Sequence, residues 1–206
     1  MLPTKAAILL NTPHFSQSIA EEYIICADGG ANLLAEGRAP YAIVGDLDSV
    51  HQDKLQGKVL FCPREKDYTD GEKAVRFAAE QGFQEIVIYG ASGGRADHIY
   101  ANLSLLALAQ TLGLKAMIDN PQEQIAFFLQ GKVQLNLPIG ATFSCLPYGD
   151  SATVSHSQGL YYPYQDLILD RRYSVGISNI VTQNLVSFEV LQGAVFVFIS
   201  KEMKGC

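Results

Sequence analysis

The hydrophobic pattern of the chain changes near residue 130, and this change limits the possible folds more than any other feature of the sequence. Before it, short apolar runs alternate with helical stretches, and after it only short strand-like runs remain. Continuous apolar runs are typical of strands that are buried on both faces. We therefore predict an α/β domain with a mostly parallel sheet over residues 1–128, followed by an all-β antiparallel sandwich over residues 129–206.

Two helices are predicted in the first half, between short strands. One begins near Thr69-Asp-Gly-Glu72, which fits a capping box, and ends before Gly82. The other begins at Asp97 or His98 and ends near Gly113. This alternation of strands and helices is what predicts a parallel sheet. The predicted strands are residues 6–10, 23–27, 42–44, 59–61, 85–89 and 116–118.

In the second half, runs such as residues 133–137 and 185–190 alternate apolar and polar side chains. Turn signals separate these runs at Pro138-Ile-Gly140, at Tyr148-Gly-Asp150 and at Gln192-Gly193. Short strands with such punctuation predict antiparallel pairing. The most clearly marked part is a final hairpin that reverses direction at Gln192-Gly193.

The charge of the chain limits its partners. It carries 15 lysines and arginines against 21 aspartates and glutamates in 206 residues, a net charge of −6. With 48% hydrophobic and 17% charged residues, the chain is too apolar for intrinsic disorder. Non-specific nucleic-acid binding requires many cations that face phosphates, so we expect no nucleic-acid partner.

The sequence also indicates the cellular compartment of the protein. No run approaches the roughly 18–20 apolar residues of a membrane helix, and Asn11 interrupts an N-terminal run that is too short for a signal peptide. The four cysteines are far apart and form no CxxC pair, which is typical of reduced thiols in a cytosol. We therefore expect a cytoplasmic protein without membrane contact. The cysteines are Cys26, Cys62, Cys145 and Cys206.

Five short motifs in the first half combine acidic, basic and glycine residues. Four of them follow a predicted strand directly or by one or two residues. The carboxyl ends of parallel strands share one edge of the sheet, where ligands bind, so we expect these motifs to meet there. The motifs are Ala27-Asp-Gly-Gly-Ala-Asn32, Gly45-Asp-Leu-Asp-Ser49, Asp67-Tyr-Thr-Asp70 with Lys73, Gly90-Ala-Ser-Gly-Gly-Arg95, and Asp97-His98.

The paired aspartates suggest a metal site. Asp46 and Asp48 lie two apart in an extended segment, so their carboxylates point the same way and repel each other unless a cation lies between them. Mg²⁺ prefers such carboxylates together with water and phosphate. The alternative is a solvated loop in which Asp48 or Ser49 caps the next helix. Asp67 and Asp70 can complete the metal site, or they can cap the helix that carries Lys73.

The glycine-rich turns suggest a phosphate site. Gly90-Ala-Ser-Gly-Gly94 exposes backbone N–H groups, leads into a helix and is followed by the cation Arg95. Asp28-Gly29-Gly30 is a second, shorter turn of this kind, although glycines often only permit a tight turn. The sequence lacks a Walker A motif, a serine-hydrolase elbow and a closely spaced histidine pair for zinc. His98 alone is expected to cap or orient its neighbours locally.

Together, these motifs resemble the ordered motif set of the thiamin pyrophosphokinase family. The second half adds two further segments that resemble that family, so the resemblance covers nearly the whole chain. The matching residues are Asp28-Gly-Gly-Ala-Asn32, Gly45-Asp-Leu-Asp-Ser49, Asp67-x-Thr-Asp70-x-x-Lys73-Ala74, Gly93-Gly-Arg-x-Asp-His98, Gly159-Leu-x-Tyr-Pro163 and Gly176-Ile-Ser-Asn179.

The resemblance implies a homodimer that transfers pyrophosphate from the co-substrate ATP to the hydroxyl of thiamin, with Mg²⁺ as cofactor. Asp46, Asp48 and Asp70 would hold Mg²⁺, with Asp67 nearby. Lys73 and Arg95 would offset charge on the phosphates, and Asp97 would receive or orient the hydroxyl. The nucleotide side of the site would comprise Asp28, Gly29, Gly30, Asn32, Ser92, Gly93, Gly94 and His98.

The resemblance also implies that the second half binds thiamin. Ser174, Ser178 and Asn179 would reach the site of the other subunit and hydrogen-bond the pyrimidine. Without the resemblance, the same residues would be an ordinary turn before a strand. The sequence departs from the family at Thr12, where many members carry glycine after asparagine. It also contains no tryptophan, so any ring stacking must come from tyrosine or phenylalanine.

Two alternative functions remain open at this point. Asp46-Leu-Asp48 with Val50 resembles the signature of haloacid-dehalogenase-type phosphatases, in which the first aspartate is a nucleophile. That signature normally follows the first strand, however, and it leaves the glycine-rich turn before Arg95 without a role. A non-catalytic nucleotide- or thiamin-binding protein is the other alternative, although binding alone rarely needs so many repelling carboxylates.

Overall fold

The computed structural model describes residues 4–55, 57–61 and 67–203. The chain forms two compact units, Met1–Pro121 and Gln122–Cys206. The boundary predicted between residues 128 and 129 lies inside strand β7 (Glu123–Asn136), and the functions assigned to the two domains stay predictions.

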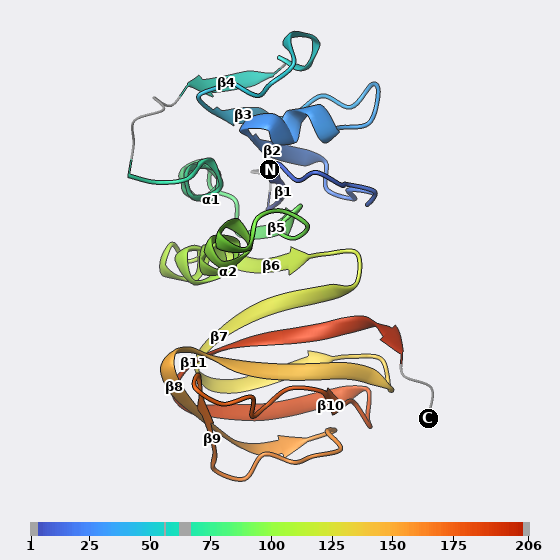
Figure 1. Ribbon diagram of the computed structural model, residues 1–206, viewed down its shortest axis with the longest axis vertical. Coiled ribbons are helices and arrows are strands. Elements are labelled where there is room, and N and C mark those ends of the chain that lie inside the picture. The colour runs from blue at the N-terminus through green and yellow to red at the C-terminus, as the bar shows by residue number, and fades with distance from the viewer. Residues whose placement is uncertain (1–3, 56, 62–66, 204–206) are drawn as a thin grey trace. The chain divides into compact units, whose positions relative to one another are not determined.

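The first unit is built on a parallel sheet with the strand order β6-β5-β1-β2-β3-β4 (Figure 1). The neighbouring strands pair in parallel throughout, as predicted. Each predicted strand is present with its ends shifted by one residue at most. The bounds are β1 Lys5–Leu9, β2 Tyr23–Ala27, β3 Ala42–Gly45, β4 Lys58–Phe61, β5 Glu85–Tyr89 and β6 Lys115–Asp119.

Two α-helices cover this sheet. Helix α1 (Asp70–Glu80) packs on β1, β2 and β3, and α2 (Ala96–Thr111) packs on β6 and on α1. The Thr69 hydroxyl accepts a hydrogen bond from the Glu72 N–H at 3.1 Å, which confirms the predicted start of the first helix. Two short 3₁₀ helices also occur, η1 (Asp28–Leu33) and η2 (Gln52–Lys54).

The inner strands are buried, but α-helices do not provide all of the cover. One apolar cluster contains Leu9, Cys26 and Tyr89 from the sheet, and Phe15 and Leu33 pack against it from the segment after β1 and from η1. Irregular chain and a 3₁₀ helix therefore complete the burial that the continuous apolar runs predict.

The second unit is antiparallel, as predicted. Strand β11 lies between β7 and β8 and pairs with both, and β8 also pairs with β9 and β10. Its core consists of inward-facing apolar side chains such as Phe143, Val154 and Val197. The remaining bounds are β8 Ala141–Gln158, β9 Leu167–Asp170, β10 Asn179–Ile180 and β11 Leu185–Met203.

Two of the predicted turns in the second unit are wrong. Gln192-Gly193 lies inside the continuous strand β11, and Tyr148-Gly-Asp150 lies inside β8, so no final hairpin forms there. The register of β11 shifts between Val190 and Ala194, because Gly193 has a φ of +78° and makes a bulge that bends the strand without reversing it. The turn at Pro138-Ile-Gly140, by contrast, does connect β7 to β8.

Two of the four cysteines lie in the described residues, and both are buried as free thiols. Burial raises the pKa of Cys26 and of Cys145 to about 12, so both thiols are neutral at physiological pH. Cys62 and Cys206 lie outside the described residues. None of the described helices combines the length and hydropathy needed to cross a bilayer.

Candidate active site

A cavity of about 740 Å³ opens in the first unit, at the carboxyl ends of its parallel strands. Residues that follow β1, β2, β3 and β5 line it, together with the first turns of α1 and α2. This is the sheet edge at which the sequence predicted that the motifs would meet. Among the lining residues are Asp28, Asp46, Asp70, Arg95 and His98.

Three aspartates meet beside this cavity. One carboxylate oxygen from each of Asp28, Asp46 and Asp48 lies within 4.8 Å of the other two. Asp28 is only 8% exposed, and its Oδ1 atom has no hydrogen-bond partner, whereas the Ser49 hydroxyl donates to its Oδ2 atom. Asp46 is half-buried and Asp48 is exposed. Carboxylates so close together repel one another unless a cation lies between them. The residues therefore fit a hard divalent cation such as Mg²⁺.

The local backbone explains why Asp28 joins the other two. Asp28 has a φ of +45° and Leu47 a φ of +64°, so both chain segments turn sharply where they leave β2 and β3. The Asn32 amide links the two segments, since it donates to the Ser49 carbonyl at 2.7 Å and accepts from the His51 N–H at 2.8 Å. Asn32, predicted on the nucleotide side, thus has structural hydrogen bonds in the loop that carries Asp48.

Gly29 and Gly30 are buried in η1 and are not among the described residues that line the cavity. A Cβ atom on Gly30 would lie 2.2 Å from the Leu9 carbonyl oxygen. Glycine is therefore required there for the close approach of two backbones. Their predicted contact with the nucleotide stays a prediction.

The predicted glycine-rich turn borders the cavity along its full length. Ser92, Gly93 and Gly94 all line it, and Arg95 ends the turn as the residue that precedes α2. Asn102, one turn further along α2 than His98, donates from its side-chain amide to the Ala91 carbonyl at 3.1 Å. Backbone N–H groups and a positive helix end meet in this wall, which suits a phosphate group.

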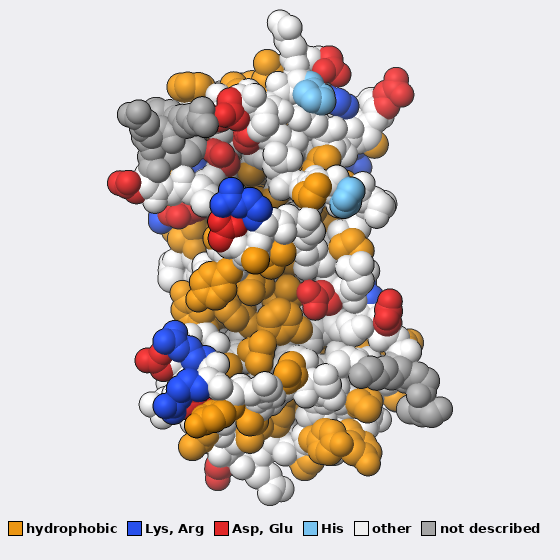
Figure 2. Space-filling view, viewed as in Figure 1, with side chains coloured by type: hydrophobic (Ala, Val, Ile, Leu, Met, Phe, Trp, Pro, Cys, Tyr) orange, Lys and Arg blue, Asp and Glu red, His pale blue; other side chains and the backbone are white. Residues whose placement is uncertain are grey.

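Arg95 and Asp97 form an ion pair with two hydrogen bonds at the point where this turn leads into α2. The Arg95 Nη2 and Nε atoms donate to the Asp97 carboxylate at 2.6 and 3.2 Å. The hydrogen bonds from Arg95 lower the pKa of Asp97 and raise the pKa of Arg95. Figure 2 shows basic and acidic side chains side by side in the region of the first unit. Asp97 is a weak proton acceptor as long as this pair is intact.

The remaining residues of the acidic motif lie around the start of α1. Asp70 lines the cavity, whereas Asp67 and Lys73 are not among the described residues that do. Lys73 lies in the first turn of α1, where its N–H donates to the Thr69 carbonyl at 3.1 Å. The structure therefore brings Asp46, Asp48 and Asp28 together more closely than the predicted set of Asp46, Asp48, Asp67 and Asp70.

Ser174, Ser178 and Asn179 lie in the second unit, on the segment between β9 and the start of β10. Ser174 and Ser178 are exposed, and the Ser178 N–H donates to the Ser144 hydroxyl at 3.0 Å. Asn179 is 4% exposed, and its side chain exchanges hydrogen bonds of 2.7 and 2.9 Å with the backbone of Tyr162. Its side chain therefore fixes the neighbouring loop, and its contact with thiamin stays a prediction.

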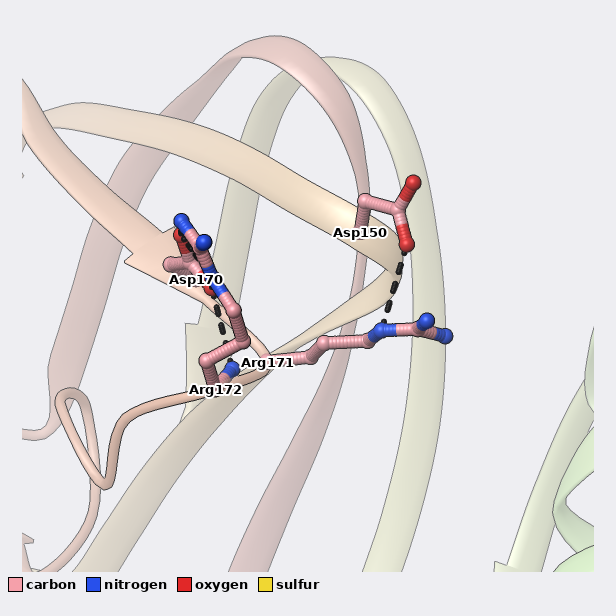
Figure 3. A network of polar contacts seen from close by, with 4 residues as sticks. All are labelled: Asp150, Asp170, Arg171 and Arg172. Atoms are coloured by element: carbon pink, nitrogen blue, oxygen red, sulfur yellow. Dashed lines mark hydrogen bonds and ion pairs between the residues drawn. The ribbon is translucent and has the colours of Figure 1, made fainter.

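Ion pairs fix the other end of this segment to the sheet (Figure 3). Arg172 donates to the Asp170 carboxylate at 2.6 and 3.0 Å, and Arg171 pairs with Asp150 of β8 at 3.1 Å. The hydrogen bonds from Arg172 lower the pKa of Asp170 to about 2. The segment that carries Ser174 thus leaves the sheet in a defined direction.

Sequence reasoning missed several residues that shape the cavity. Leu10, Tyr68 and Ile99 line it, and Asn102 supports the glycine-rich turn. A signal for Asn102 was present, because it lies four residues after His98 and so on the same face of the helix. The apolar lining residues carried no such signal, since they resemble ordinary core positions.

The model of the thiamin pyrophosphokinase catalytic domain matches residues 16–118, which is half of the chain. The chain belongs to the thiamin pyrophosphokinase family. It is therefore an enzyme, a diphosphotransferase. Within this family, the chain is similar to thiamin pyrophosphokinase 1 of Caenorhabditis elegans, with 26% identity over 190 residues that cover 85% of this chain and 78% of that protein. The thiamine pyrophosphokinase of Bacillus subtilis is 25% identical over 181 residues, which cover 84% and 85% of the two chains.

Solved structures of thiamin pyrophosphokinases share the fold. The crystal structure of the Bacillus subtilis enzyme has a TM-score of 0.81 at 22% identity and covers 97% of this chain and 100% of that one. The enzyme from Candida albicans has a TM-score of 0.82 at 18% identity, with coverages of 97% and 90%. At these identities the likeness concerns the fold. The phosphatase alternative is disfavoured, since its aspartate motif follows β3 here and not the first strand.

Proposed function

We propose that the cavity of the first unit binds ATP and that the chain there transfers the pyrophosphoryl group to the hydroxyl of thiamin, giving thiamin diphosphate and AMP. The observation that carries this proposal is the buried, unpartnered Oδ1 atom of Asp28 within a cluster of three aspartates, beside a glycine-rich turn that suits phosphates. A cluster of repelling carboxylates next to a phosphate site fits a metal-bound nucleotide.

Asp46, Asp48 and Asp70 would hold Mg²⁺, with Asp28 as a further ligand beyond the set predicted from the sequence and with Asp67 nearby. When bound, Mg²⁺ supplies positive charge that offsets the phosphate oxygens. Lys73 and Arg95 would add positive charge that offsets the phosphates. Ser92, Gly93 and Gly94 would present backbone N–H groups to the phosphates, and Gly29, Gly30, Asn32 and His98 would shape the nucleotide side.

The reaction is a displacement at the β-phosphorus of ATP. The thiamin hydroxyl oxygen forms a bond to this phosphorus, the bond from it to the oxygen that bridges the α- and β-phosphates breaks, and AMP leaves with that oxygen. The hydroxyl proton passes to Asp97. Since Asp97 is paired with Arg95, we propose that the phosphates draw Arg95 away, after which the pKa of Asp97 rises and the carboxylate can accept the proton.

The second unit would bind thiamin. We propose that residues 129–206 form the thiamin-binding and dimerisation sandwich, that residues 1–128 form the catalytic domain, and that the enzyme is a cytoplasmic homodimer. Ser174, Ser178 and Asn179 of one subunit would then reach the site of the other. Exposed hydroxyls on a segment fixed at both ends support this assignment, because a pre-ordered loop loses little entropy on binding.

A direct assay of the reaction products tests the proposal. The purified chain is incubated with ATP, Mg²⁺ and thiamin, and the nucleotides are separated and quantified. We expect AMP and thiamin diphosphate in equal amounts, and no AMP when thiamin or Mg²⁺ is omitted. Phosphate release from phosphate esters without ATP would overturn the proposal in favour of a phosphatase. ATP and thiamin binding without any AMP would overturn it in favour of a non-catalytic binding protein.

A further inference from the structure

Thr12 lies directly beneath the glycine-rich turn of the first unit. Its side chain is 4% exposed, and its hydroxyl donates to the Ser92 carbonyl at 2.7 Å. A Cβ atom on Gly90 would lie 3.2 Å from the Thr12 methyl carbon, and one on Gly93 would lie 3.3 Å from the Thr12 hydroxyl oxygen. Thr12 thus lies against three residues of this turn, Gly90, Ser92 and Gly93.

The hydrogen bond from Thr12 determines where the next N–H group points. A peptide unit is planar and trans, so the carbonyl of Ser92 and the N–H of Gly93 point in opposite directions. Because the carbonyl points toward the buried Thr12 hydroxyl, the Gly93 N–H points away from it. Ser92 and Gly93 both line the cavity. Thr12 is not among the described residues that line the cavity, so the Gly93 N–H, which points away from Thr12, is available to a group bound there.

Without this bond, the turn would have a second conformation available. Gly93 has a φ of +86°, and glycine populates both signs of φ with similar ease. The peptide between Ser92 and Gly93 can then rotate and present its carbonyl to the cavity. A carbonyl oxygen repels a phosphate, whereas an N–H group binds it. Asn102 fixes the Ala91 carbonyl but leaves the next peptide unconstrained.

We propose that Thr12 is a positioning residue for the nucleotide: its hydroxyl holds the Ser92–Gly93 peptide in the one orientation that directs an N–H group at the triphosphate. This inference rests on the proposed function, since it assumes that ATP occupies the cavity. It assigns a role to a residue that touches no reacting atom and that acts only through the turn above it.

The test compares Thr12→Val, which keeps the shape but loses the donor, with Thr12→Ser, which keeps the donor. Thr111→Val is a matched control, because the Thr111 hydroxyl also donates to a backbone carbonyl at 2.7 Å, but in the last turn of α2. Dissociation constants for a non-hydrolysable ATP analogue and for AMP are measured by calorimetry with Mg²⁺, and steady-state constants are measured for ATP and thiamin.

We expect Thr12→Val to raise both the dissociation constant of the ATP analogue and the KM for ATP about fivefold to tenfold, as the loss of one hydrogen bond predicts. Its effect on the KM for thiamin should stay below about twofold. Thr12→Ser and Thr111→Val should resemble the wild type. Equal losses in Thr12→Val and Thr12→Ser would overturn the inference, because packing would then be the cause, and so would unchanged ATP binding in Thr12→Val. Binding is measured without turnover, so failure of the proposed reaction would be seen separately, as absence of AMP in the wild type.

Discussion

The aspartates of the two units have different surroundings. In the second unit, Asp170 and Asp150 face arginines of the adjacent loop, and their charges are balanced within the chain. In the first unit, Asp28, Asp46 and Asp48 face one another, and a buried oxygen of Asp28 has no partner. The same residue type therefore stabilises a loop in one unit and leaves a negative site open to a cation in the other. The candidate binding site is therefore marked by a buried carboxylate oxygen without a hydrogen-bond partner, and not by the number of acidic residues.

The comparison predicts its largest effect at the acidic cluster. Asp48→Asn removes one of the three facing charges and should weaken binding of the proposed metal. We expect turnover to fall by about a thousandfold, because a metal ion stabilises the charge of such a transition state by several kcal/mol. The measurements are thiamin-dependent AMP formation and the affinity for Mn²⁺ in the absence of nucleotide. Asp53→Asn, an exposed aspartate of η2, is the control and should retain wild-type values. Normal turnover in Asp48→Asn would show that this cluster holds no catalytic metal.

A second prediction concerns how tightly the loop of the second unit is fixed. Gly176 has a φ of +95°, and a Cβ atom there would lie 2.2 Å from the Cys145 carbonyl oxygen. Gly176→Ala should lower the free energy of unfolding by about 2–4 kcal/mol. Gly149→Ala is the matched control, since Gly149 has a φ of +94° and open space around it, and it should cost only about 1 kcal/mol. Urea denaturation measures both, and equal losses would contradict a rigid attachment of this loop.

A smaller effect is expected at Asn179, whose amide holds the backbone of Tyr162. Asn179→Ala should raise the KM for thiamin about tenfold and leave the KM for ATP within about twofold, because the change is confined to the proposed thiamin side. Asn184→Ala, at an exposed position in the turn before β11, serves as the control. A larger effect on the KM for ATP than on that for thiamin would argue against thiamin binding by this unit.

The smallest expected effect is a change in the pKa of Asp170, which tests the charge balance in the second unit. Asp170 has a pKa of about 2, below its ordinary value of 3.8, because Arg172 donates to it. A lowered pKa contributes stability that is present above the ordinary value and lost as the pH falls through about 2. Arg172→Gln should therefore raise the pKa of Asp170 toward 3.8, as measured by NMR of the carboxyl group. Arg76→Gln, in the first unit, should leave this value unchanged.

Much of the first unit could be predicted from the sequence, because the physical signals are local. Continuous apolar runs mark buried parallel strands, and the polar residues directly after them share one edge of the sheet. The participation of Asp28 in the acidic cluster could not be predicted in this way. It depends on the sharp turn at Asp28 itself and on the Asn32 amide that links two segments far apart in the sequence.

The second unit was less predictable, since glycine has two meanings in a strand. The turn signals at Gly149 and Gly193 predict breaks between strands, and the second predicts a hairpin, but both glycines lie inside long strands and bend them. Whether a glycine reverses or bends a strand depends on the partner strand, which local sequence does not reveal. Thr12 illustrates a similar limit, because its hydrogen bond joins residues that are 80 positions apart.

The position of β11 has a consequence for how the chain folds during synthesis. Strand β11 pairs with β7 on one side and β8 on the other, yet it follows both in the sequence. The ribosome therefore releases β7 and β8 before the strand that joins them exists, and both present unpaired edges until then. The first unit, which ends at Pro121, is released before β7 and has no such delay. Nascent chains that stop before β11 should thus contain a folded first unit and an aggregation-prone remainder.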